Sequence, residues 1–161
     1  MKIGILEAGQ NNAKMDPRHP QYATMFTSMF AAISAPLSCT AIAVKDGIFP
    51  ESVDAFDGYL ITGSACGVYD DEPWINQLII FVREAHAQKI PLMGICLGDQ
   101  LLADALGGWA EKSKKGWGVG ERTVDIKTHA HWMHGDKNTV TLIYFHQDQV
   151  IQLPEGAKKL A

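Results

Sequence analysis

The chain has 161 residues and a formal net charge of −4, with 47% hydrophobic and 20% charged residues. This length suits one domain with a single core, and the composition is that of a globular protein. The negative charge argues against a nucleic-acid partner, because phosphate binding needs clustered Lys or Arg side chains. No apolar stretch approaches the roughly 20 residues of a membrane helix, and no signal peptide is visible. Three unevenly spaced cysteines predict neither a disulfide framework nor a zinc site, so we expect a cytoplasmic protein without a membrane role.

Short apolar strands alternate with amphipathic helices along the first two thirds of the chain. The predicted strands are residues 2–6, 39–44, 58–62 and 90–95. The predicted helices are residues 22–33, a short one at 51–56, one that begins near Pro73, and one that follows Cys96. Alternation at these lengths predicts a parallel sheet with right-handed crossovers.

The helix predicted at 22–33 has the clearest amphipathic pattern. Its apolar stripe consists of Tyr22, Met25, Phe26, Met29, Phe30 and Ile33. Such a stripe of Met and aromatic side chains is far more often core than cofactor site, so we expect it to be buried.

Cys96 stands where the strand at 90–95 runs directly into a helix. Gly94 and Gly98 flank it at two residues on either side, the spacing of the Gly-x-Ser-x-Gly nucleophile elbow. Such a turn lifts the central side chain onto the first turn of a helix, where free N–H groups and the helix dipole favour thiolate. We therefore interpret Cys96 as a nucleophile. The alternative is a buried structural cysteine in a packing joint.

Amide hydrolysis by a thiolate also needs hydrogen-bond donors for the oxyanion. The backbone N–H of Leu97 is one candidate, and that of Gly63, at the end of the strand at 58–62, is the other; an ordinary strand-ending turn is the alternative for Gly63. Gln100 lies one helical turn beyond Cys96, so its amide either reaches over the nucleophile or is simply exposed. Because the carboxyl ends of parallel strands share one edge, we expect these residues to converge there.

The residues alone suggest His146 as the base. It follows an apolar strand, and Asp148 is placed to orient it, which gives a Cys96–His146–Asp148 triad.

Beyond Gly108 the chain becomes rich in β-formers. Strands are predicted at 119–128 and 139–145, as antiparallel additions at an edge of the sheet. His129, His131 and His134 lie between them, but no further ligand is placed to complete a zinc site. We therefore expect a polar hairpin there, with no metal and no cofactor.

Four segments resemble the class I glutamine amidotransferases. Residues 94–100 (GICLGDQ) resemble the family's GICFGHQ elbow, and three further matches are ITGSACGVYDDEPWI (61–75), KSKKGWGVG (112–120) and HQDQV (146–150). The resemblance covers nearly the whole chain and is closest to the stand-alone, GMP-synthase-like branch. It implies one domain over residues 1–161 with a doubly wound, flavodoxin-like α/β fold: a mostly parallel sheet, helices on both faces and antiparallel edge additions.

The resemblance also implies an activity. Such proteins hydrolyse the γ-glutamyl amide of glutamine, or of another γ-glutamyl compound, through a cysteine thioester and release ammonia. On this chain the nucleophile would be Cys96, with Gly63 and Leu97 as the oxyanion hole. The implied substrate-binding residues are Ser64, Gln100, His146 and Gln147, so the resemblance places His146 beside the substrate and not in the triad. A synthetase partner that accepts the ammonia, and a homo-oligomer, are further expectations.

Two departures from the family pattern lead us to expect impaired hydrolysis. Asp99 stands where the family elbow usually has His, and its charge opposes thiolate formation, although a carboxylate itself is favoured at a helix start. The family's catalytic His and Glu come from a His-Pro-Glu motif, which does not occur in this sequence. We favour the interpretation that the C-terminal part of the domain is missing, with a degenerate amidotransferase as the alternative. A truncated sheet should expose apolar surface and promote association.

Two other functions remain open. One is a non-catalytic pseudo-amidotransferase that binds glutamine or a protein partner. The other is a cysteine hydrolase or stress protein of the intracellular-protease branch, which shares a similar elbow. The Thr62-Gly63-Ser64 loop and the HQDQV segment argue against the second.

Overall fold

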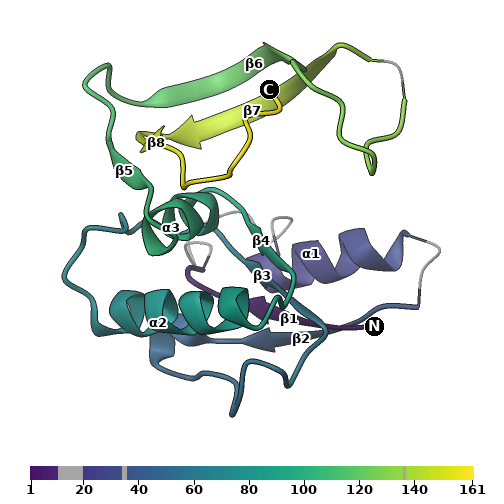
Figure 1. The fold of residues 1–161 in the computed structure, drawn as a ribbon, viewed down its shortest axis with the longest axis vertical. Coiled ribbons are helices and arrows are strands. Elements are labelled where there is room, and N and C mark those ends of the chain that lie inside the picture. The colour runs from purple at the N-terminus through teal and green to yellow at the C-terminus, as the bar shows by residue number, and fades with distance from the viewer. Residues whose placement is uncertain (11–19, 34–35, 136) are drawn as a thin grey trace.

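A four-stranded parallel sheet forms the centre of the fold (Figure 1). The computed structural model describes residues 1–10, 20–33, 36–135 and 137–161. The sheet has the order β2–β1–β3–β4, and its strands are β1 (Lys2–Leu6), β2 (Ser38–Ile42), β3 (Gly58–Ile61) and β4 (Leu92–Gly94). Ile5 pairs with Ala41 on one side and with Leu60 on the other, and Leu60 pairs with Met93. The predicted α/β fold with a mostly parallel sheet is confirmed.

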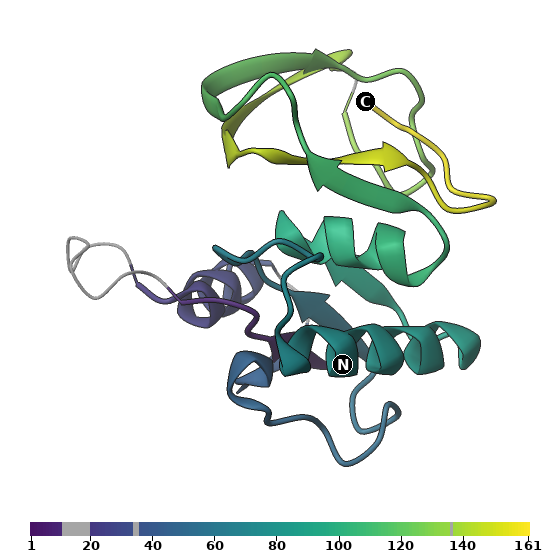
Figure 2. The ribbon, with the colours of Figure 1, turned by 90° about the vertical axis from the view of Figure 1, so that its left-hand side faces the viewer.

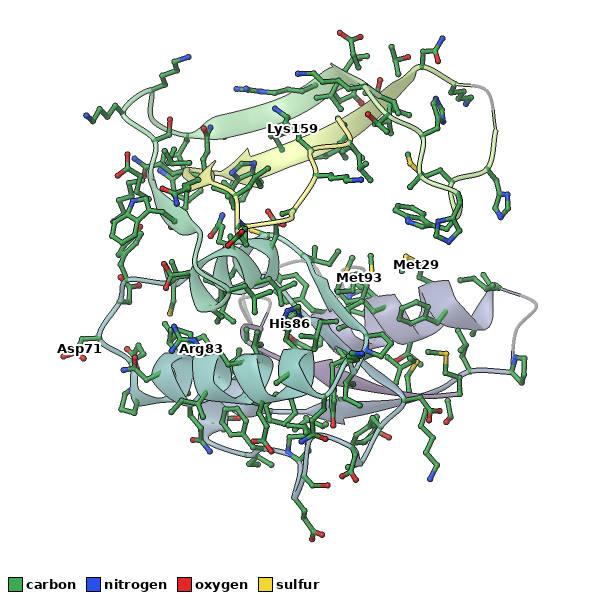
Figure 3. The ribbon with its side chains drawn as sticks, in the orientation of Figure 1. Met29, Asp71, Arg83, His86, Met93 and Lys159 are labelled. Carbon is green, nitrogen blue, oxygen red and sulfur yellow. The ribbon has the colours of Figure 1, made fainter. Side chains whose placement is uncertain are left out.

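The larger core lies between the sheet and two helices, α2 (Pro73–Ala87) and α3 (Leu97–Ala105). Leu6 and Ile61 from the strands pack with Leu78 of α2 and Leu101 of α3, and all four are fully buried. Pro73 is in the first turn of α2, as predicted, because a proline there loses no helical hydrogen bond. Arg83 of α2 joins the two helices, because its Nε donates to the carbonyl of Ala105, the last residue of α3, over 2.8 Å. Figure 3 labels Arg83 on α2.

Helix α1 (Tyr22–Ala31) covers the opposite face of the sheet with a smaller core. Ala23, Phe26 and Phe30 pack against strand residues such as Ile5 and Leu60. The prediction that the whole apolar stripe is buried is wrong, because Met25 and Met29 are 45% and 47% exposed and Ile33 is 51% exposed. Phe26 and Phe30 pack against the sheet, whereas Met25 and Met29, each about 100° around the helix from one of these rings, stay exposed. Figure 3 shows Met29 on the side of α1 away from β1.

Two local predictions also need correction. Residues 51–56 form turns and bends and no helix. The Ser52 hydroxyl donates to the Asp54 carboxylate there, and such local side-chain bonds compete with a helix of so few residues. The strand predicted to reach residue 44 ends at Ile42, after which the chain enters a short 3-10 helix, η1 (Val44–Asp46).

The antiparallel strands form two ribbons that are separate from the parallel sheet. β5 (Trp109–Lys112) pairs with β8 (Asp148–Gln152), and β6 (Gly118–Asp125) pairs with β7 (Thr139–His146). The predicted antiparallel strands therefore exist, but they do not extend an edge of the sheet. Helix α3 packs against β5 and β8 and lies between the sheet and the ribbons (Figure 2). Among the described helices, none combines the length and apolar character needed to span a membrane.

Candidate active site

Cys96 occupies a strained elbow between β4 and α3. Its backbone angles are φ 56° and ψ −110°, so a residue with a side chain is held in a region that L-residues avoid. A Cβ on Gly94 would lie 2.3 Å from the Gly98 carbonyl carbon, and one on Gly98 would lie 2.5 Å from the Ile61 oxygen. Neither contact is sterically allowed, so both positions require glycine, as the spacing predicted. Cys96 itself is exposed, which excludes the alternative of a sealed structural cysteine.

The environment of the Cys96 thiol opposes its ionisation. Burial of the sulfur raises its pKa most, although the residue as a whole is exposed. The Leu97 backbone N–H favours the thiolate and lowers the pKa, and the negative charges of Asp148 and Asp99 raise it further. The net shift of the pKa is upward. The expectation that the helix start would make this thiol acidic is therefore wrong, because desolvation and two carboxylates outweigh the backbone contribution.

Gly63 lies directly against the cysteine. A Cβ at this position would be 3.4 Å from Cys96 Cβ and 3.8 Å from its sulfur. Among the described residues, the Gly63 N–H has no acceptor. The carbonyl of the same residue is held by the buried Thr62 hydroxyl, which donates to it over 3.2 Å and accepts the Ala8 N–H over 3.0 Å. The end of β1, the end of β3 and the cysteine thus meet at one edge, as chain order predicted.

The Asp148 carbonyl joins the β7–β8 turn to the first turn of α3. Gln100, only 6% exposed, donates its amide N–H to this oxygen over 3.1 Å, and His146 Nδ1 lies 2.8 Å from the same oxygen. A carbonyl only accepts, so Nδ1 carries the hydrogen and a neutral His146 leaves Nε2 as an acceptor. The amide donor of Gln100, which the sequence suggested for substrate contact, is therefore engaged with the protein.

The imidazole of His146 acts on the charge of Asp99 across this junction. Asp99 as a residue is exposed, but partial burial of its carboxyl raises the pKa, and the nearby His146 partly offsets that shift. The carboxylates of Asp99 and Asp148 both act on the Cys96 thiol, and the protonated form of Asp99 therefore persists to a higher pH than usual.

The remaining predicted substrate residues lie in the loops on either side. The Ser64 hydroxyl accepts the Cys66 N–H over 3.2 Å, directly after Gly63. Gln147 forms the turn between β7 and β8, where its carbonyl accepts the Ser113 N–H over 3.1 Å.

Tyr69 makes a contact that the sequence analysis missed. Its hydroxyl donates to the Asp148 carboxylate over 2.8 Å, and the Lys112 ammonium lies 5.2 Å from the centre of its ring. Tyr69 and Asp148 are 79 residues apart, so no local pattern could reveal the pair. The only sequence signal was that each lies in a segment that resembles the amidotransferases.

Comparison with known proteins agrees with this geometry. Residues 22–161 match the family described as glutamine amidotransferase class-I. Gamma-glutamyl peptidase 5 of Arabidopsis thaliana is 32% identical over 125 residues, which cover 73% of this chain and 50% of that protein. A glutamine-hydrolyzing GMP synthase component of Archaeoglobus fulgidus is 40% identical over 72 residues, 45% of this chain and 39% of that protein.

A solved structure has the same fold. The crystal structure of a glutamine amidotransferase from Thermotoga maritima superposes with a TM-score of 0.80 at 19% identity, and the match covers 99% of this chain and 65% of that one. The chain spans about half the length of the first curated relatives that it matches. Because the family match extends over most of the sequence, the chain belongs to the class I glutamine amidotransferase family.

Proposed function

We propose that this chain cleaves γ-glutamyl amides through a thioester on Cys96. The observation that supports this most is the exposed cysteine in a positive-φ elbow, with Gly63 against its sulfur and, within the described part of the chain, no acceptor for the N–H of that glycine. The family and the γ-glutamyl peptidase among the relatives support the same bond as the target.

The chemistry has two halves. The Cys96 sulfur forms a bond to the γ-carbonyl carbon, and the Gly63 and Leu97 N–H groups hold the oxyanion. The C–N bond then breaks, and the amine leaves with the proton that the thiol gave up. Water adds its hydroxyl to the thioester carbon and its proton to the sulfur, which releases glutamate and restores the thiol. Ser64, His146 and Gln147, together with the Gln100 oxygen, would contact the glutamyl part.

We further propose that acylation is faster than hydrolysis of the thioester in this chain. Departure of ammonia or an alkyl amine needs a proton donor, and activation of water needs a base. The 161 residues contain no His-Pro-Glu motif to supply them. An amide with a good leaving group avoids the first requirement, so it should acylate Cys96 even when turnover is slow.

The test uses γ-glutamyl-p-nitroanilide with the full chain. We expect a burst of p-nitroaniline equal in amount to the protein, and a glutamyl adduct on Cys96 in intact-mass spectrometry. Cys96→Ala should abolish both, and Cys39→Ser, which changes a cysteine in β2, should change neither. A wild-type chain that releases no p-nitroaniline over a range of pH would overturn the proposal.

One observation favours a second candidate, a module that binds glutamine without cleaving it. The raised pKa of Cys96 keeps the thiol protonated at neutral pH. A non-catalytic module predicts saturable glutamine binding by calorimetry together with no labelling by a glutamine-like chloroketone. A cleaving enzyme predicts stoichiometric labelling that glutamine blocks. The relative described as part of a GMP synthase also leads us to propose a partner that uses ammonia, which co-purification with a synthetase would test.

A further inference from the structure

Residues 63–72, here called the oxyanion loop, connect β3 to α2 and begin with Gly63. Hydrogen bonds within the loop make it a compact unit. The Gly67 N–H donates to the Asp70 carboxylate over 2.9 Å, and the Asp70 N–H returns to the Gly67 carbonyl over 3.1 Å. Together with the bond from the Cys66 N–H to the Ser64 hydroxyl, these contacts hold the loop in one conformation, so that a displacement of Tyr69 would be passed on to the backbone near Gly63.

The outer part of this loop is tied across the site by one side chain. Tyr69 reaches from the loop to the Asp148 carboxylate at the start of β8, and Lys112 of β5 lies over its ring. Asp148 is in turn joined to α3, one turn after Cys96, by the Gln100 bond to its carbonyl. The oxyanion loop and α3 are therefore connected through Tyr69, Asp148 and Gln100 as well as through the sheet.

The hydroxyl of Tyr69 remains a donor over the working pH range. Tyr69 is 45% exposed, but partial burial of its hydroxyl raises its pKa, and so do its hydrogen bond to Asp148 and the charges of Asp148 and Asp70. The ring itself is closely backed, because a Cβ on Gly67 would lie 2.4 Å from Tyr69 Cζ. A methyl group at Gly67 would push the ring away from Asp148 without altering either partner of the hydrogen bond.

We propose that Tyr69 is a positioning residue, which holds the oxyanion loop so that the Gly63 N–H stays aligned with the substrate oxygen at Cys96. The inference rests on the proposed function, since it assigns Gly63 to the oxyanion hole. Tyr69 touches no reacting atom in this scheme. Its effect passes through Asp148 on one side and through the backbone of residues 63–69 on the other.

The test compares two reactions of the same sulfur. Acylation by γ-glutamyl-p-nitroanilide passes through an oxyanion, whereas alkylation by iodoacetamide forms a C–S bond, releases iodide and needs no oxyanion donor. For Tyr69→Phe we expect acylation to slow about tenfold, less than the loss of an oxyanion donor, while alkylation is unchanged. Gly67→Ala should give the same pattern. Tyr22→Phe, which removes a hydroxyl from α1 on the other face of the sheet, should change neither reaction.

Amide hydrogen exchange gives a readout that does not depend on activity. In Tyr69→Phe the Cys66 and Gly67 amides should exchange faster than in the unsubstituted chain. Unchanged exchange would overturn the inference, as would unchanged acylation by the variant of an active chain, or an equal loss of acylation and alkylation. If the unsubstituted chain itself releases no p-nitroaniline, the proposed function fails, and exchange alone decides whether Tyr69 anchors the loop.

Discussion

Gly98 packs against Ile61 so closely that a Cβ would lie 2.5 Å from the Ile61 carbonyl oxygen. This contact joins the first turn of α3, which directly follows Cys96, to the end of β3, which precedes Gly63. The distance between Cys96 and the loop that begins at Gly63 therefore depends on the absence of one methyl group.

Gly98→Ala should destabilise the protein even though alanine is the better helix former. Helix propensity alone predicts a gain of about 1 kcal/mol, whereas a methyl forced against backbone costs about 1–3 kcal/mol. The clash should win, because the neighbouring atom belongs to a backbone carbonyl that cannot rotate away. Urea unfolding followed by circular dichroism would show a lower midpoint, and a raised midpoint would mean that α3 can shift without strain.

Asp148→Asn should lower the pKa of Cys96 toward its ordinary value. The Asp148 charge raises that pKa, so removing it favours the thiolate and should speed alkylation by iodoacetamide at neutral pH by about threefold. A titration of thiolate absorbance against pH would measure the shift. Asp104→Asn, a change at the far end of α3, should leave it in place, and a Cys96 pKa unaltered by Asp148→Asn would contradict the electrostatic account.

Asp99→Asn should stabilise the protein more at neutral than at acidic pH. The folded-state pKa of Asp99 is raised, so its favourable contribution is complete below the unfolded-state pKa of about 4 and is lost as the pH rises through the folded-state value. Asparagine has no charge to desolvate and escapes that loss. The difference should be small, because Asp99 is exposed and solvent screens its charge. Urea midpoints of both proteins at pH values on either side of this window would diverge on the alkaline side; parallel curves would show that Asp99 is not desolvated.

Gln100→Met should cost about 1 kcal/mol of stability. The substitution removes the donor that joins α3 to the Asp148 carbonyl, but that oxygen keeps His146 as a partner and is not left unsatisfied. The measurement is the urea midpoint, with the His146 ring followed by nuclear magnetic resonance. We expect a broadened or shifted ring signal, since the turn that holds His146 loses its second anchor. A signal identical to that of the unsubstituted protein would argue that the turn is held elsewhere.

Ile143→Thr should reduce self-association. Ile143 is 83% exposed on β7, and Phe145, two residues on and on the same face, is 71% exposed beside the ring of Trp117. This apolar face favours contact between copies at high concentration. Threonine keeps the strand preference but removes apolar area, so light scattering should report a smaller average mass. Equal masses for both proteins would exclude this face as the cause of association.

The local pattern of the sequence was enough for the parallel core and for the elbow. Alternating strand and helix periodicities predicted β1 to β4, α1, α2 and α3, and two glycines around Cys96 predicted the turn that the structure contains. These features are set by neighbours within a few residues, through backbone sterics and the burial of one face. Gly63 could be placed near Cys96 because parallel strands end at the same edge.

Only the tertiary structure decided how the surroundings of the site act on it. Burial and two negative charges raise the pKa of Cys96, and one of these charges belongs to Asp148, more than fifty residues away along the chain. The helix start alone therefore suggested the opposite sign. The sequence also showed no sign of the Tyr69–Asp148 bond, of the bond from the Gln100 amide to the Asp148 carbonyl in β8, or of the exposed methionines of α1. Periodicity shows which side chains share a face, but what covers that face, and which charges lie beside a thiol, depends on contacts between segments that are remote along the chain.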